Sequence, residues 1–459
     1  MEDIRKFLKG IKNYTELRVQ ENISYELSFI NGDCISNYKS KSRGIFARSY
    51  NEGYWGVSSA PFSENIQIEN VLKDAVDNAV FLRNNSKKRD TSIITTKEQF
   101  EIFKDYGKAK SVLSDKEKLD FIKEIDNYIV KKYPLICSRN ISLYGHESNK
   151  KLANSFGSFS NLIVPSTSLY INLTLNKDKA NHELYDLIGN LGKMEDVFND
   201  PKRLFDKVDL LYQNLEKKSL AVQAKSGVKD VIIGESIGGI LAHEAIGHTT
   251  EADSVMTGSI ANKYLGKQVA GSFLNIVDFA HTAFGEDCPV PVLVDDEGVK
   301  AKDAYLIKDG ILTGYMHNRE TAAYFDQELT GNARASAFND IPLIRMRNTC
   351  ILPGKDKLQD MISSIEDGYY LIQSGNGRAE KTSEFMFGVK FGFEIKNGKI
   401  GNAIKDTTVS GVAFDLLKTV TMISDEFKWA PFGGYCFKQQ PISTSNGSPA
   451  IKCKINIGG

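Results

Sequence analysis

Cysteine is scarce in this sequence and shows no pattern typical of a disulfide scaffold. The six cysteines of the 459-residue chain are widely spaced and form no Cys-x-x-Cys pair; they stand at positions 34, 137, 288, 350, 436 and 453. Small secreted domains stapled by disulfides need dense cysteine spacing, so that class is excluded. The pattern fits a reducing compartment, and we expect a cytoplasmic protein.

Long apolar runs and an excess of charge are also missing. No stretch approaches the roughly 18 uncharged apolar residues of a membrane-spanning helix. The N-terminal residues MEDIRKFLKGIKNYTELRV include early acids and no apolar core, so we expect no signal peptide. The 58 basic and 58 acidic residues cancel, which leaves no overall attraction to nucleic acid or anionic lipid. We therefore expect neither a nucleic-acid partner nor a membrane partner.

The first half of the chain alternates between strand and helix patterns. Residues 43–59, RGIFARSYNEGYWGVSS, predict a hairpin that turns near Asn51-Glu52-Gly53. Apolar residues at three-to-four spacing predict amphipathic helices. The predicted helices cover residues 66–85, 114–133 and 201–223, and further strands are expected at 25–32, 141–148 and 162–177.

The second half is richer in strand patterns. A short strand is expected at 289–298, PVPVLVDDEG, and hairpins around Asp309-Gly310 and Asn397-Gly398, because both dipeptides favour tight primed turns. No long βαβ alternation is present, so the sheet should be antiparallel. We predict an α+β fold with an α/β N-terminal domain at 1–190, a helical linker at 191–227 and a β-rich, barrel-like C-terminal domain at 228–459.

The segment LAHEAIGHTTEAD, residues 241–253, carries the histidine pattern His-Glu-x-x-x-His. The zinc-protease pattern His-Glu-x-x-His has one residue fewer, and its two histidines lie about 40° apart around a helix. Residues five apart diverge by about 140°, so a regular helix could not aim both rings at one ion. The pattern can bind a metal only if the helix widens into a π-bulge or breaks before His248. Gly247, a residue of low helix propensity, stands where such a distortion is needed.

A catalytic zinc usually takes three protein ligands and keeps one position open. His243 and His248 would supply two, and Glu244 would act as general base on the water that the metal activates. The residues alone do not choose the third ligand among Glu251, Cys436 and Cys453. Each of the nearby carboxylates, Glu251 and Asp253, could be a ligand or could instead orient an imidazole. From the pattern alone, two structural histidines on a core helix are the more common explanation.

Several ordered segments resemble the TldD/PmbA family. VIIGESIGGILAHEAIGHTTEAD is similar to its signature, in which a Gly-rich apolar strand leads into HEAxGHxxExD. The resemblance continues through VLVDDEGVKAKDAYLIKDGILTGYMHNRETA, LTGNARASAFNDIPLIRMRNTCILPG, FMFGVKFGFEIKNGKIGNAIKDTTVSG and PAIKCKINIGG. In the N-terminal half, RGIFARSYNEGYWGVSS and KLANSFGSFSN are the best matches. The resemblance therefore extends over nearly all of the C-terminal half.

This resemblance implies a zinc-dependent peptidase of the TldD type, whose metal is held by both histidines and a cysteine near the C-terminus. The implied ligands are His243, His248 and Cys436, because Cys436 stands in the family's Gly-x-Cys turn; Glu244 is the implied general base. Cys453 falls in the terminal strand, where the family motif needs no cysteine. The resemblance further implies a homodimer, or a heterodimer with a PmbA/TldE-like subunit, that encloses a chamber for peptides.

Two departures from the family pattern bear on substrate preference and on the type of dimer. The family often shows Gly-Lys-x-Gly-Gln after the metal cysteine, whereas residues 437–440 here read Phe-Lys-Gln-Gln. The family's TGNGRR reads TGNARA at 330–335. Alternatively, the protein is a non-catalytic peptide-binding or assembly partner with a structural or vestigial metal site. In a structural site, a fourth protein ligand would occupy the coordination position that a catalytic zinc leaves open.

Overall fold

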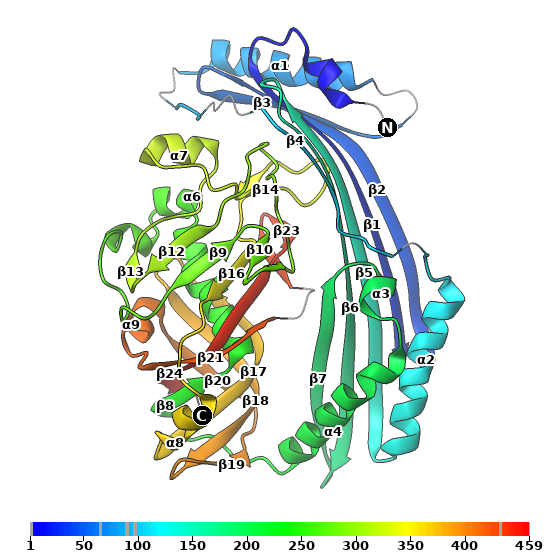
Figure 1. The fold of residues 1–459 in the computed structure, drawn as a ribbon, viewed down its shortest axis with the longest axis vertical. Helices are drawn as coiled ribbons and strands as arrows, with labels where there is room; N and C mark the ends of the chain where they lie inside the picture. Colours follow the sequence, from blue (N-terminus) through cyan, green and yellow to red (C-terminus); the bar gives the residue numbers. More distant parts are fainter. Residues whose placement is uncertain are drawn as a thin grey trace.

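The computed structural model describes residues 3–63, 67–87, 91–94, 99–109, 111–430 and 434–458. The N-terminal half forms long, curved strands that run side by side, and the C-terminal half lies against them as a second, strand-rich body (Figure 1). Strands far outweigh helices in both halves. The α+β class expected from the sequence is confirmed, and the C-terminal body contains a closed barrel. The residue bounds proposed for the two domains and the linker stay a prediction.

The N-terminal sheet has seven strands among the described residues, in the order β3-β2-β1-β5-β6, with β4 and β7 both pairing with β6. All neighbours are antiparallel except β4, which is parallel to β6. The strands are β1 (Tyr14–Ile30), β2 (Asp33–Asn51), β3 (Tyr54–Pro61), β4 (Glu101–Asp105), β5 (Ile136–Asn154), β6 (Phe159–Lys177) and β7 (Ala180–Leu191).

Amphipathic helices cover parts of this sheet. Helix α1 (Ile68–Asn85) packs on β2 and β3, α2 (Asp115–Lys132) on β5, and α4 (Phe205–Ser219) on β6 and β7. Each buries apolar residues at three-to-four spacing, such as Ile122, Ile125 and Ile129 of α2. A short helix α3 (Met194–Val197) and the 3₁₀ turns Ile4–Leu8 and Pro201–Leu204 complete this half.

The C-terminal sheet has eleven strands among the described residues. Nine follow the order β13-β12-β9-β16-β24-β20-β18-β17-β8, while β19 pairs with β18 and β21 with β24. A further pairing of β24 with β8 closes a ring. Two pairs of neighbouring strands are parallel, β16 with β24 and β17 with β8. The expectation of an antiparallel sheet is therefore only partly met. The strands are β8 (Gly227–Ile233), β9 (Ile276–Phe279), β12 (Ala304–Lys308), β13 (Ile311–Leu312), β16 (Asn348–Ile351), β17 (Asp367–Ala379), β18 (Glu384–Lys396), β19 (Lys399–Ala403), β20 (Thr407–Val412), β21 (Met422–Trp429) and β24 (Ser445–Ile457).

Shorter elements surround this barrel. The two-stranded pairs are β10 (Thr282–Ala283) with β11 (Glu286–Asp287), β14 (Ala333–Arg334) with β15 (Leu343–Ile344), and β22 (Tyr435–Lys438) with β23 (Gln440–Ser443). The helices are α5 (Glu235–Ile240), α6 (Ala252–Met256), α7 (Arg319–Phe325), α8 (Leu358–Ser363) and α9 (Ala413–Lys418). No helix among the described residues is long and apolar enough to cross a membrane.

The predicted hairpins are confirmed, but the strand expected at 289–298 is wrong. Asp309 and Gly310 have φ angles of 51° and 75°, and Asn397 and Gly398 of 48° and 71°, as primed turns require. Between 289 and 298 the only pairing is the bridge of Val294 to Lys300. Pro289 and Pro291 lack the N–H that a ladder needs, and the Asp295 carboxylate binds two backbone N–H groups of a turn instead.

Candidate metal centre

The two histidines lie on a widened helix. Helix α5 leads into a π-helical segment, η3 (Leu241–Gly247), followed by a 3₁₀ turn, η4 (His248–Thr250). The backbone N–H of His248 donates to the carbonyl of His243, five residues earlier, which is the π-helical bond. This bond places the two histidines one above the other, and their ring centroids are 5.4 Å apart. The distortion that the His-Glu-x-x-x-His spacing requires is therefore confirmed.

Gly247 serves this segment through its small size. Its φ of −55° is one that any residue adopts, so the backbone there needs no glycine. A Cβ atom at this position, however, would lie 2.0 Å from Sδ of the buried Met346. The helix thus lies closer to the segment that carries Met346 than a side chain at position 247 would allow.

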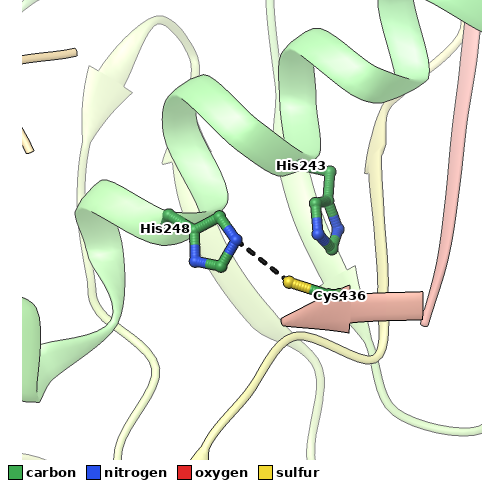
Figure 2. Close-up of side chains that lie close together, drawn as sticks. All are labelled: His243, His248 and Cys436. Atoms are coloured by element: carbon green, nitrogen blue, oxygen red, sulfur yellow. Dashed lines mark hydrogen bonds between the residues drawn. The ribbon is translucent and has the colours of Figure 1, made fainter. Parts of the chain in front are cut away.

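Cys436 reaches the histidines from a distant part of the chain. It lies in β22, which pairs with β23 so that Cys436 faces Ile442. Its Sγ is 3.0 Å from Nε2 of His248, and one donor atom each of His243, His248 and Cys436 lies within 4.8 Å of the others. Figure 2 shows both imidazoles and the sulfur converging between the helix and the strand.

Burial and mutual contact strongly shift the pKa values of Cys436 and His248. Burial raises the pKa of the Cys436 thiol, but hydrogen bonds with His243 and His248 outweigh burial and lower that pKa to about 5. Burial lowers the pKa of His248, but the charge of Glu251 and the contact with Cys436 raise it to about 10. Without metal the pair is thus a thiolate beside an imidazolium at neutral pH, and a divalent cation would take the place of that proton.

Glu244 lies beside both imidazoles. Its carboxylate oxygens are 3.7 Å from Nε2 of His248 and 4.0 Å from Nε2 of His243. The Glu244 side chain is 28% exposed, so solvent reaches it although it lies beside the donor atoms. This position is suited to proton exchange with a water held between the three donors.

Glu251 contacts the opposite nitrogen of His248. Its Oε2 accepts a hydrogen bond of 3.1 Å from Nδ1, while Nε2 of the same ring faces Cys436. Burial raises the pKa of Glu251, but the charges of His248, Lys438 and Arg345 outweigh it and lower that pKa. Of the two roles left open by the sequence, this geometry is that of a group that orients an imidazole. Asp253 does not contact the histidines and instead binds Lys438.

The donor set fits a catalytic zinc. Two imidazoles and one thiolate are ligands that zinc favours, and three protein ligands leave one position open. The Nδ1 atom of His243 is buried and has no hydrogen-bond partner among the described residues. Cys453, the other cysteine considered, lies in β24 opposite Val231 and packs within the barrel core, where burial raises its pKa.

Sequence reasoning missed two residues of this centre, Lys438 and Arg345. Lys438 binds Glu251 and Asp253, and Arg345 donates to the backbone carbonyl of Cys436. Lys438 was detectable in principle, because residues two apart on a strand share a face, so a ligand at 436 places 438 beside it. Arg345 carries no such local pattern.

Comparison with known proteins agrees with this architecture. Family models described as "PmbA/TldA metallopeptidase C-terminal domain" and "PmbA/TldA metallopeptidase domain 1" match residues 226–459 and 15–82. A zinc metalloprotease TldD homolog of Saccharolobus solfataricus is 29% identical over 98% of this chain and 99% of its own length. A metalloprotease TldD homolog of Buchnera aphidicola subsp. Acyrthosiphon pisum is 31% identical over 75% of this chain and 73% of its own.

Solved structures with a similar fold are also found. The crystal structure of TldE from Thermococcus kodakarensis superposes with a TM-score of 0.75 over 99% of both chains, at 17% identity. At this identity the likeness concerns the fold alone. The two matching family models and these relatives together establish that this chain belongs to the PmbA/TldD metallopeptidase family.

Proposed function

We propose that the protein is a zinc-dependent peptidase whose metal is held by His243, His248 and Cys436. The observation that carries this proposal is the convergence of the three donor atoms. Cys436 is 188 residues from His248, and nothing in local structure requires its sulfur to lie 3.0 Å from an imidazole nitrogen. The name of the Saccharolobus solfataricus relative, a zinc metalloprotease, supports zinc as the ion.

Glu244 is the general base in this proposal. When bound, zinc polarises a peptide carbonyl as a Lewis acid and makes a nearby water acidic enough to lose a proton at neutral pH. Glu244 accepts that proton and later delivers it to the leaving amine, so one carboxylate serves both halves of the hydrolysis. Glu251 holds the His248 ring so that Nε2 stays directed at the donor cluster.

We propose small or unfolded peptides as substrates. The thiolate adds negative charge to the site, which should make the metal a weaker Lewis acid than one with three histidines and the enzyme correspondingly slow. Selectivity would then come from access to the site. Sustained cleavage of a folded globular protein would contradict this proposal.

The partner proposed is a second copy of this chain or a PmbA/TldE-like subunit that closes a chamber over the site. Beside the donor cluster, the side chains of Glu244 and His248 are 28% and 25% exposed, and Tyr435 and Phe437 on the Cys436 hairpin are 60% and 74% exposed. Exposed aromatic residues are typical of surfaces that contact another chain or a peptide. All six cysteines are free, which supports the cytoplasm as the compartment.

The first test is zinc content together with peptide hydrolysis, measured on the wild type, Cys436→Ala and Glu244→Gln. The wild type should hold about one zinc per chain and cleave unstructured peptides. Cys436→Ala should lose both, whereas Glu244→Gln should keep its zinc and lose about 10²- to 10⁴-fold in rate. Cys453→Ala is the matched control, a buried cysteine outside the cluster that should change neither.

Three results would contradict the proposal or shift it to the alternative function. Zinc retained by Cys436→Ala would exclude that cysteine as a ligand. Full activity of Glu244→Gln would exclude the base. A wild type that binds zinc but cleaves nothing, even with a PmbA/TldE-like subunit added, would favour a non-catalytic assembly partner.

A further inference from the structure

The hairpin β22–β23 contacts the turn after His248 through the ammonium group of Lys438, whose side chain is 20% exposed. Lys438 lies two residues beyond Cys436 on β22 and therefore shares its face, while Tyr435 and Phe437 face away and are exposed. The Nζ atom of Lys438 donates to Glu251 at 3.1 Å, to both carboxylate oxygens of Asp253 at 2.7 and 2.8 Å, and to the carbonyl of Ile344 at 3.4 Å. An ammonium has three N–H donors, and here three groups receive them.

These contacts connect segments that are remote in sequence. Lys438 is 187 residues from Glu251 and 185 from Asp253, so the ammonium joins the strand of Cys436 to the turn after His248. Glu251, 1% exposed, in turn accepts from Nδ1 of His248. A continuous chain of polar contacts thus leads from the strand of the thiolate, through Lys438 and Glu251, back to the imidazole that faces the same thiolate.

We infer that Lys438 is a positioning residue of the metal centre, which fixes the Cys436 strand and the Glu251 carboxylate so that the donor atoms converge before a metal arrives. This inference rests on the proposed function. Arg345 reinforces the arrangement from the other side, because it donates to the carbonyls of Cys436 and Gln440, and its Nε is 3.8 Å from Glu251. Among the described residues, only Lys438 contacts both carboxylates that follow His248.

Positioning and simple electrostatics predict opposite effects when Lys438 is removed. Loss of a positive charge near a cation site should strengthen zinc binding by Coulomb attraction alone. Loss of a group that orders the ligands should weaken binding, and residues behind metal ligands typically account for about 10- to 100-fold in affinity. The sign of the change therefore identifies the role.

The experiment measures zinc affinity of the full-length protein by competition with a chromophoric chelator. Lys438→Met keeps the length of the side chain and removes the ammonium; zinc should bind about 10- to 100-fold more weakly. Lys438→Arg should recover part of that loss, because it restores a cation between the two carboxylates. The visible spectrum of the Co²⁺-loaded protein provides a second readout, since it reports ligand geometry independently of peptide hydrolysis; it should change in Lys438→Met.

Lys454→Met is the matched control. Lys454 binds both oxygens of Asp230 at 2.9 and 3.0 Å, as Lys438 binds Asp253, but this pair joins β24 to β8 on the barrel. Its removal should leave zinc affinity within about twofold, as expected for an exposed ion pair remote from the centre. If Lys438→Met does not fold, Asp253→Asn replaces it. Asp253 is 37% exposed, and its loss should still weaken zinc binding by about threefold or more.

The outcomes separate this inference from the proposed function. A wild type that binds no zinc overturns both. A wild type that binds zinc, with Lys438→Met (or Asp253→Asn) binding it equally or more tightly and with an unchanged Co²⁺ spectrum, overturns the positioning role alone. Equal losses in Lys438→Met and Lys454→Met also overturn it, because the effect would then not belong to the centre.

Discussion

At the scale of single residues, the metal-free centre is a pair of oppositely charged groups. The Cys436 thiol has a pKa of about 5 and His248 one of about 10, so the thiolate should persist from neutral pH down to about 5. An ordinary cysteine would be protonated throughout that range. The ultraviolet absorbance of thiolate, compared between zinc-free wild type and Cys436→Ser, should disappear with a midpoint near pH 5. A midpoint near the ordinary value for cysteine would contradict the ion pair.

The sequence predicted the residues of this centre unevenly. The spacing of His243, Glu244 and His248 made them candidates, because a helix relates close neighbours by geometry. The pattern alone still favoured two structural histidines, and the family resemblance was needed to favour a metal site. Cys436 was one of several candidates until the family resemblance singled it out, since no local rule connects it to a helix 188 residues away. Arg345 and Lys438 were missed because their roles depend on tertiary contacts, although Lys438 shares a strand face with Cys436.

At the scale of elements, the π-helical segment depends on close packing at Gly247. Gly247→Ala would place a methyl group against Met346, and overpacking of this kind costs about 1–3 kcal/mol of unfolding free energy. Because the strain falls between His243 and His248, zinc affinity should fall as well. Urea unfolding and chelator competition measure the two effects.

The matched control for this change is Gly401→Ala. A Cβ at Gly401 meets Glu394 only at 3.5 Å, an ordinary contact on the exposed strand β19. Stability and zinc affinity should stay close to those of the wild type. An alanine at 247 that is equally well tolerated would show that the segment can shift away from Met346.

Element prediction succeeded where short-range rules decide the structure. The α1, α2 and α4 helices follow from apolar periodicity, and the hairpins at 309–310 and 397–398 from turn residues. It failed at 289–298, where alternating apolar residues suggested a strand, but the prolines and the Asp295 turn leave only the isolated bridge of Val294 to Lys300. The ring closure of β24 with β8 pairs residues more than 200 positions apart, which periodicity cannot reveal.

At the scale of the whole molecule, buried ion pairs join the N-terminal sheet to the C-terminal half. Arg48 on β2 binds Glu16 on β1 at 2.8 Å and Glu297 of the C-terminal half at 2.6 Å, and all three side chains are at most 5% exposed. Nearby, Lys150 on β5 binds Asp296 at 2.8 Å. The two halves are thus joined by a cluster of Arg48, Glu16 and Glu297 (the Arg48 cluster), whose charges have little access to water.

Removing Arg48 should therefore destabilise the molecule severely. Arg48→Met leaves Glu16 and Glu297 buried without their shared cation, and breaking a buried pair in this way costs about 3–5 kcal/mol. Arg83→Met is the control, because its pair with Glu52 is 47% and 68% exposed and contributes about 1 kcal/mol or less. Urea unfolding followed by tryptophan fluorescence should show a large loss for the first variant and almost none for the second. Similar stability of the two variants would mean that solvent reaches the Arg48 cluster and that apolar packing, rather than this charge network, holds the C-terminal half against the N-terminal sheet.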